Sequence, residues 1–557
     1  METFLSGQIA VWLVAGTFLA LIAIRYLHAF VTGYILPDEA WYYITFILEG
    51  QRPFYREVFQ GAFLLFFHGV RDVFSFLWRG LFYSILWTLG SLLLMYKALK
   101  ISGASKVAIS LVLLTVPFFA IFPAMAPFIV TEPVGLFFAM LGIYLLLLHL
   151  RNEKAKYALL SAVAFVLASK AREPYLIFAV GNLGALLFLR RDLRSIISYA
   201  IPVAIVAPIP VRLDSLSFSQ PVYTLITRLV TLLTTTSTAQ GGPPSQSMSV
   251  VDIPTLTRGI FSPTIDIPVS VGPFDVVQAI AVSLQVARNP LFVSLMLISM
   301  IFLAHSAWIS KSRVNIALFY NAILAAISFV VPIMLILSSL PAALTAWTST
   351  IIRASHTGFP MLAGFKDFYS RPRIRRIAPV LLVLMLAFTL VQFNAYGREL
   401  QASLSQEAVN RLSLDYRAPY YRLYLIAQNS GHTLVLGLHL RGIRVYMSML
   451  PNVAVLPVPS AETAFQELTS RGWDTIFLYD DWLTIRVPSM LNAYPPYYRQ
   501  ILLSQSYFGY IVEALWVDGE SYALRMTKGS AVTGEEFLPT KSQVPCLFEH
   551  YTFGLFK

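Results

Sequence analysis

The chain has 557 residues, of which 57% are hydrophobic and only 13% are charged, and its formal net charge is +12. Soluble globular proteins have about 45–50% apolar and about 25% charged residues, and several runs of roughly twenty residues here carry no charge. The composition therefore excludes an ordinary soluble protein and indicates a multi-pass membrane protein. Lys and Arg in cytoplasmic loops account for the positive charge, so no nucleic-acid partner is expected.

The first apolar run, residues 8–30, is too long for a signal-peptide core and follows no basic segment, so we expect a retained span. The single cysteine, Cys546, cannot form an intrachain disulfide and is interpreted as structural. Similar apolar runs recur along the chain and predict about eleven transmembrane helices. These lie near residues 8–30, 76–96, 107–123, 133–150, 157–169, 175–189, 195–211, 290–309, 314–340, 350–365 and 377–394.

The basic residues predict the orientation of these helices. If the N-terminus is cytoplasmic, every predicted inner loop is short and basic, as the positive-inside rule requires. We therefore expect a cell-membrane protein with a transmembrane domain at 1–395 and an extracytoplasmic domain at 396–557. Outer loops are expected at 31–75 and 212–289. The basic residues of the inner loops are Lys97, Lys100, Lys106, Arg151, Lys154, Lys156, Arg190, Arg191, Arg194, Lys311, Arg313, Lys366, Arg371, Arg373, Arg375 and Arg376.

The outer segments have recognisable local patterns. The stretch "FQGAFLLFFHGV" in the first loop is amphipathic and is expected to lie along the membrane interface. In the terminal domain, "HTLVLGL", "DTIFLYD", "GYIVEALWV" and "SYALRM" predict strands. Between the first two, "SAETAFQELTSRG" predicts a helix with Ser460 as N-cap and Gly472 at the C′ position. The terminal domain is therefore expected to have a mixed α/β fold.

Ionisable residues collect at the outer ends of the predicted spans. Charged side chains near span ends are commonly solvated or extend to the interface, which is the structural alternative to a site. In "YILPDEAWYY", however, Asp38 and Glu39 repel each other, and apolar neighbours raise that cost, which favours a functional role. A carboxylate can accept a proton from a hydroxyl, and Arg or Lys can bind a phosphate. The other residues at this depth are Glu132, Lys170, Arg172, Arg353 and His356.

The order of these motifs resembles the GT-C superfamily of membrane glycosyltransferases, especially the branch of the protein O-mannosyltransferases and the lipid A aminoarabinose transferases. The resemblance covers residues 1–190 and 350–395. It departs from the family in two ways: "REVFQGAF", with Arg56, stands where a Lys-Pro-Pro stretch is common, and Glu132 replaces the usual Asp. The motifs are "PDEAWYYITFILEGQRPFY", "FLWRGLFYS" with Arg79, "TEPVGLFF", "LASKAREPYLIF" and "RASHTGFPMLAGF".

The resemblance implies transfer of a sugar from a polyprenyl-phosphate donor to a hydroxyl of a protein, lipid or glycan, with inversion. It implies that Asp38 is the catalytic base and that Glu39 orients it or a neighbouring group. Tyr42 and Tyr43 line the sugar site or belong to the interfacial aromatic belt. A divalent cation is compatible, although a lone carboxylate pair is a poor metal site. The residues expected to bind donor phosphate or substrate are Arg56, Arg79, Glu132, Lys170, Arg172, Arg353, His356, Tyr42 and Tyr43.

Other functions are also compatible with the sequence. A transporter or flippase would place ionisable residues near the membrane midplane within matching repeats, whereas the acidic residues here lie at the outer rim. An oligosaccharyltransferase usually separates its first-loop carboxylates by one residue and carries a Trp-Trp-Asp-Tyr-Gly motif. Here "RGWDTIF" offers only Trp473 and Asp474. A non-catalytic subunit of a membrane assembly would retain the fold without activity.

Overall fold

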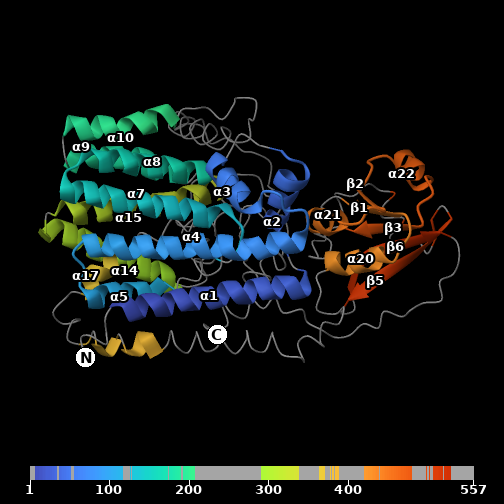
Figure 1. Ribbon diagram of the computed structural model, residues 1–557, viewed down its shortest axis with the longest axis horizontal. Coiled ribbons are helices and arrows are strands. Elements are labelled where there is room, and N and C mark those ends of the chain that lie inside the picture. The colour runs from blue at the N-terminus through green and yellow to red at the C-terminus, as the bar shows by residue number, and fades with distance from the viewer. Residues whose placement is uncertain are drawn as a thin grey trace, which may run out of the picture.

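The computed structural model describes residues 7–33, 35, 37–51, 56–116, 126, 128–172, 175–189, 192–206, 290–310, 312–337, 363–369, 377, 379–381, 383–387, 419–437, 440–479, 497, 501, 506–507, 509–517 and 520–528. In this part of the chain, long helices form an elongated bundle, and a small α/β domain lies at one end of it (Figure 1). The predicted outer loop at 212–289 and most of the predicted span at 350–365 lie outside the described residues.

The bundle has two layers of helices. The first layer runs across Figure 1 in the spatial order α1, α4, α7, α8 and α10, with each helix packed on the next. These helices are α1 (Gly7–Thr32), α4 (Val73–Ile101), α7 (Thr131–Asn152), α8 (Ala155–Ala171) and α10 (Leu193–Val206). The second layer packs against the first and contains α5 (Lys106–Thr115), α17 (Phe365–Tyr369), α14 (Pro290–Ser310), α15 (Arg313–Leu337) and α9 (Leu176–Leu189).

Three of the described helices, α1, α4 and α7, are long and apolar enough to cross a membrane. The 29 residues of α4 span about 44 Å at 1.5 Å per residue, more than a bilayer's hydrocarbon core. Apolar side chains lie on its outward face, where Trp78, Phe82, Leu86 and Leu93 are all exposed, and charged residues lie near its ends. Among the described residues, helices also overlap the predicted segments from 107–123 to 195–211, and those at 290–309 and 314–340. The total of about eleven spans stays a prediction.

Local sequence signals explain where several helices of the bundle begin. Asp72 caps α4, because its carboxylate accepts hydrogen bonds from the Ser75 N–H at 2.8 Å and the Ser75 hydroxyl at 2.7 Å. Ser105 caps α5 through the Ala108 N–H. Pro133 lies in the first turn of α7, where its missing N–H costs no helical hydrogen bond. These helices thus begin with the same capping residues that begin helices in soluble proteins.

One end of the bundle gathers several of the predicted inner loops, and we call it the basic end. The Arg313 guanidinium lies 3.4 Å from the Glu153 carboxylate, which joins the α14–α15 turn to the α7–α8 turn. Lys366 of α17 donates to the Asn315 side chain at 2.7 Å and to the Ser102 carbonyl at 3.5 Å. Segments that the positive-inside pattern places on one side of a membrane therefore meet at one end of the molecule.

The opposite end carries the α/β domain, and we call it the domain end. Three short elements lie there between the bundle and the domain: α2 (Pro37–Tyr42), the π-helical η1 (Tyr43–Leu48) and α3 (Glu57–Phe67) (Figure 1). Phe59, Phe63 and Phe67 form the buried face of α3, whereas Leu65 is 79% exposed. The predicted amphipathic stretch is therefore a helix, and it packs across α4, α7 and α8.

The α/β domain is built on a six-stranded mixed sheet with the order β2-β1-β3-β6-β5-β4. The strands β1, β2 and β3 are parallel, and β4, β5 and β6 are joined by antiparallel pairing. The four predicted strands are confirmed as β1, β3, β5 and β6. The elements are α20 (Pro419–Gln428), β1 (Thr433–Gly437), α21 (Arg441–Met447), β2 (Val453–Pro457), α22 (Glu462–Thr469), β3 (Thr475–Tyr479), β4 (Ser506–Tyr507), β5 (Tyr510–Val517) and β6 (Glu520–Lys528).

The predicted helix between β1 and β3 is α22, with one difference at its start. Its N-cap is Ala461 rather than Ser460, and no side chain caps it. The extended conformation of Ala461 places the start of the helix one residue later than the Ser signal indicates. At the other end, the C-cap is Ser470, so Gly472 lies two residues beyond it and not at the predicted C′ position. Its φ of +83° is a left-handed conformation that glycine adopts without strain.

The two faces of the sheet belong to different cores. Leu434, Leu436 and Ile476 pack with Phe465 of α22 on the outer face. The alternate strand residues Val435, Phe477 and Tyr479 share a core with α21 and with α2, η1 and α3 at the end of the bundle. The α/β domain therefore has no separate core on this face, and burying it requires the helices that follow α1.

Candidate active site at the domain end

Asp38 and Glu39 lie in the first turn of α2, directly after a sharp turn of the chain. Gly33 makes this turn with φ +70°, and the Tyr421 ring lies so close that a Cβ at Gly33 would come within 2.4 Å of it. Pro37 then starts α2, as its fixed φ favours. The backbone of Asp38 belongs to α2, and its side chain lies outside the described part of the structure. Its role as a base stays a prediction.

Glu39 is fully buried and forms an ion pair with Arg25 of α1, which is 4% exposed. The other carboxylate oxygen accepts the Ile129 N–H at 2.8 Å. The Arg25 guanidinium also lies 4.4 Å from the Tyr26 ring centroid and 4.9 Å from that of Phe128. A buried carboxylate that lost its cation would be strongly destabilising, so Glu39 fixes α2 to α1 and to the segment before α7.

Glu132 and Arg172 form a second buried ion pair, with an Arg172 Nη2 to Glu132 Oε1 distance of 3.4 Å. Glu132 is in the first turn of α7, where a negative charge interacts favourably with the helix dipole. The Thr131 hydroxyl donates to Glu132 Oε2 at 3.1 Å. Gly135, one turn later, leaves room for both Arg172 and the Tyr175 ring, which would lie 2.6 Å from an added Cβ. The structure thus brings these two predicted site residues together.

Arg56 and Tyr42 also meet. Arg56 is the N-cap of α3 and has φ +58°, a left-handed conformation that costs a non-glycine residue about 1–2 kcal/mol. Its Nη1 donates to the Tyr42 hydroxyl at 3.2 Å. The Tyr42 ring stacks on Phe46 and packs 4.6 Å from the Phe59 ring centroid. A strained arginine beside a buried tyrosine is consistent with a site, because such strain collects at functional positions.

Tyr43 and Arg79 have different surroundings. The Tyr43 ring packs on Phe76, and its hydroxyl has no hydrogen-bond partner among the described residues. Burial raises the pKa of Tyr43 to about 12, and the negative charge of Asp72 adds to the shift. Arg79 donates to the carbonyls of Phe66 at 3.1 Å and His68 at 2.9 Å, which satisfies the last carbonyls of α3. Donor binding by either residue stays a prediction.

Lys170 lies in the last turn of α8, where its ammonium is 3.6 Å from the carboxylate of Glu57 in the first turn of α3. The side chains are 20% and 49% exposed, so water reaches both. Arg353 and His356, which are predicted to complete this cation group, lie outside the described residues. Lys170 and Glu57 therefore offer the solvent-accessible charges of this part of the site.

The sequence interpretation missed three residues that the site depends on. Arg25 falls within the first apolar run, and an arginine in a membrane span is a signal of function or of a buried partner. Tyr420 and Tyr446 of the α/β domain bind the segment that precedes α2. The Tyr420 hydroxyl forms hydrogen bonds with the Ile35 backbone, and the Tyr446 hydroxyl donates to the Gly33 carbonyl at 2.7 Å. Their sequence signal is weak, because they are two of many tyrosines in that domain.

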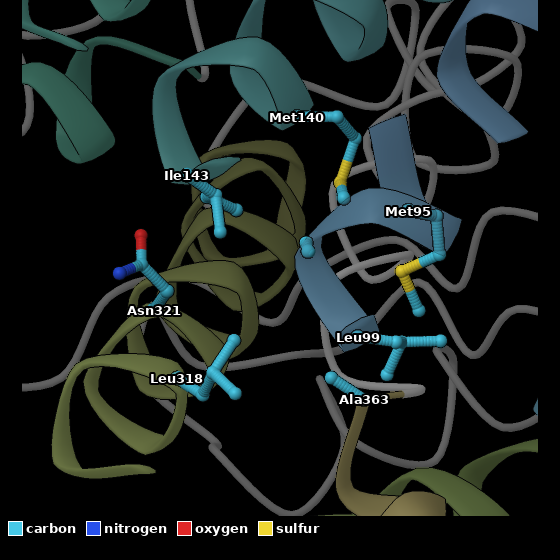
Figure 2. A pocket seen from close by; sticks show the side chains of 8 residues that line it. Met95, Leu99, Met140, Ile143, Leu318, Asn321 and Ala363 are labelled. Atoms are coloured by element: carbon cyan, nitrogen blue, oxygen red, sulfur yellow. The ribbon is translucent and has the colours of Figure 1, made fainter. Parts of the chain in front are cut away.

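A small cavity of about 10 Å³ lies between α4, α7 and α15, away from these charges (Figure 2). It has room for about one water molecule. Asn321, on its wall, exchanges two hydrogen bonds with Asn182 of α9, at 2.9 Å and 3.0 Å. This satisfied pair fixes the register of α9 against α15. The lining residues are Met95, Ala98, Leu99, Met140, Ile143, Leu318, Asn321 and Ala363.

Within the described residues, no group of three or more His, Cys, Asp or Glu side chains is placed to hold a metal ion. Comparisons with known proteins add no assignment: no protein-family model matches the chain, and a search of curated proteins finds no match. The chemistry of the site therefore has to be argued from the ion pairs, the π-helical segment and the exposed charges at the domain end.

Proposed function

We propose that this chain is an integral-membrane glycosyltransferase that moves a sugar from a polyprenyl-phosphate donor to an acceptor hydroxyl. The observation that carries the proposal is the gathering of predicted site residues at one end of the bundle. The predicted residues Asp38 of α2, the Glu132–Arg172 pair, Arg56 and Lys170 come from four segments, and contacts join α2, α3, α7 and α8 there. The GT-C-like order of motifs in the sequence supports the same function.

The difference between the two ends of the bundle supports a membrane arrangement. We propose that about eleven helices cross the membrane, that the basic end faces the cytoplasm and that the domain end faces outward. A lipid-linked sugar would keep its hydrocarbon tail among the helices and present its phosphate near α3 and the end of α8. The exposed apolar side chains of α4, such as Trp78 and Phe82, are suited to contact lipid.

The proposed reaction needs one base and one phosphate-binding group. Asp38 removes the proton of the acceptor hydroxyl, whose oxygen attacks the anomeric carbon. The bond between that carbon and the phosphate oxygen breaks, and the polyprenyl phosphate leaves with the bonding electrons. A cation stabilises the phosphate charge, so no strong acid is required. Attack opposite to the leaving group inverts the anomeric centre.

The structure supports a division of roles within the site. Glu39 and Glu132 are buried and neutralise Arg25 and Arg172, so both carboxylates support the architecture. Asp38 is then the acidic residue of the adjacent pair that we assign to proton transfer. Lys170, which is accessible to water, is assigned to the donor phosphate together with Arg56 and Arg353.

A transporter is the alternative that the test must separate from an enzyme. A transporter would need charged residues near the middle of the bundle, whereas the buried ion pairs of the described residues lie at the domain end. Asn182 and Asn321 are buried between α9 and α15, and they satisfy each other. The described part of the structure thus favours chemistry at the end of the bundle over passage through it.

The test is a transfer assay on the purified full chain with a panel of polyprenyl-phosphate sugars and hydroxyl acceptors. Asp38→Asn should lower turnover about 10²–10⁴-fold while donor affinity is retained, because the amide cannot accept the proton. Glu153→Gln is the matched control, since this carboxylate is exposed at the basic end. Turnover near the parental value in Asp38→Asn would exclude Asp38 as the base. Absence of transfer with every donor would exclude the proposed function.

A further inference from the structure

The cations at the domain end fall into two groups by the quality of their partners. Some have short contacts, and those in buried ion pairs, Arg25 and Arg172, cannot leave them without a large cost. Lys170 differs, because its ammonium lies 3.6 Å from Glu57, beyond the usual length of a charged hydrogen bond, and both side chains reach water. The cations with close or buried partners are Arg25 with Glu39, Arg172 with Glu132, Arg444 with Glu49 at 2.7 Å, and Arg79 with two carbonyls.

A loose, partly exposed ion pair is easily exchanged for another anion. Exposed pairs contribute little to stability, because water and salt screen their attraction. Breaking the Lys170–Glu57 contact would return the Glu57 carboxylate to solvent, since that side chain is 49% exposed. Neither charge would be left buried and uncompensated.

The backbone around this pair is well anchored. Lys170 is in the last turn of α8, and Glu57 is in the first turn of α3. The buried faces of Phe59 and Phe63 hold α3 in the aromatic cluster with Tyr42. An exchange of partners therefore needs only rotation of two side chains, with no movement of a helix.

We propose that Glu57 is a competing counterion of Lys170, which a phosphate monoester or diester group of the bound ligand displaces. The inference rests on the proposed function only for the source of the phosphate, a polyprenyl-phosphate lipid. Glu57 then sets affinity: it holds Lys170 in place when the site is empty and weakens the binding of poorly placed anions. A phosphate group offers the ammonium several acceptor oxygens, and a monoester also carries more negative charge than a carboxylate, so a well-placed phosphate wins this exchange.

The test measures equilibrium binding of polyprenyl phosphate to the full-length protein in detergent, without any transfer reaction. Glu57→Gln should tighten binding about twofold to fivefold, because Lys170 loses its competitor. Lys170→Met should weaken binding about tenfold or more. In the double variant, the gain from Glu57→Gln should disappear, because there is no ammonium left to release. Glu153→Gln removes a similar exposed carboxylate at the basic end and should leave binding unchanged.

The outcomes separate the possible explanations. Equal tightening by Glu57→Gln with and without Lys170 would mean simple charge repulsion and would overturn the proposal, as would no tightening at all. Inorganic phosphate and the uncharged polyprenol serve as further probes: a lipid phosphate site binds the phosphorylated lipid best, whereas a free-phosphate site binds the inorganic ion equally well. If the binding changes of the single and double variants are as expected but no sugar is transferred, Glu57 keeps its role as counterion and the glycosyltransferase proposal is refuted. If sugar is transferred but the variants bind polyprenyl phosphate like the parent protein, the glycosyltransferase stands and the role of Glu57 is refuted.

Discussion

The buried Arg25–Glu39 pair allows a sharp prediction about stability. Glu39→Gln keeps the size of the side chain and an oxygen that can still accept the Ile129 N–H. It removes the negative charge from a residue that is fully buried and leaves Arg25, which is 4% exposed, without its counterion. The variant therefore tests the charge of Glu39 almost in isolation from its shape.

The expected loss is large because of where the pair lies. Loss of an ordinary neutral hydrogen bond costs about 0.5–1.5 kcal/mol, whereas an uncompensated buried charge costs about 3–5 kcal/mol. Arg25→Met should cost a similar amount, since it strands the carboxylate instead. The double variant Arg25→Met with Glu39→Gln should be more stable than either single variant, because no charge remains buried.

The assay is unfolding of purified protein in detergent, followed by tryptophan fluorescence as temperature or denaturant rises. Where unfolding is irreversible, inactivation half-lives at a fixed temperature rank the variants by stability. Glu153→Gln serves as the exposed control and should change stability by less than about 1 kcal/mol, because its pair with Arg313 is solvated. A Glu39→Gln protein as stable as this control would refute the claim that Glu39 anchors α2.

Two further predictions concern the docking of the α/β domain and the topology. Burial raises the pKa of Tyr446 well above its ordinary value of 10.0, so its contribution to stability is present below pH 10 and is lost as pH rises above it. Tyr446→Phe should cost about 0.5–1.5 kcal/mol at neutral pH and flatten the alkaline fall in stability, both measured by unfolding at a series of pH values. For topology, single cysteines near residues 154 and 450, placed in a Cys546→Ser background, should be labelled from opposite sides of sealed vesicles. Labelling of both from one side would contradict the proposed arrangement.

Hydrophobic length and periodicity were sufficient to locate most of the fold. The apolar runs at 8–30 and 133–150 became α1 and α7. A run of about twenty apolar residues in lipid or in a protein core must satisfy its own backbone hydrogen bonds, and a helix does so. The short apolar stretches "HTLVLGL" and "DTIFLYD" became β1 and β3, whose side chains alternate between two cores. The short β2 and α21 were not predicted, since neither is long enough to show a period.

The partners within the site could not be predicted, because they depend on tertiary packing. Glu39 pairs with Arg25, 14 residues away, and the Tyr446 hydroxyl bonds the Gly33 carbonyl across 413 residues. No local pattern specifies contacts at these separations. The left-handed Arg56 is similarly invisible in sequence, since an arginine in that conformation is uncommon and is maintained only by its surroundings.

The contacts of the segment around Asp38 give the α/β domain a physical role. Before α2, Tyr446 and Tyr420 bind the backbone of Gly33 and Ile35, and after η1, Arg444 pairs with Glu49 at 2.7 Å. Between these points, Glu39 is fixed to α1. A base contributes to catalysis only when it is held close to its productive geometry, and a short helix tied at both ends and in the middle meets that requirement. Because the domain supplies both end contacts, loosening it should lower turnover more than donor affinity, since Lys170, which we propose binds the phosphate, belongs to α8 and has no part in this docking.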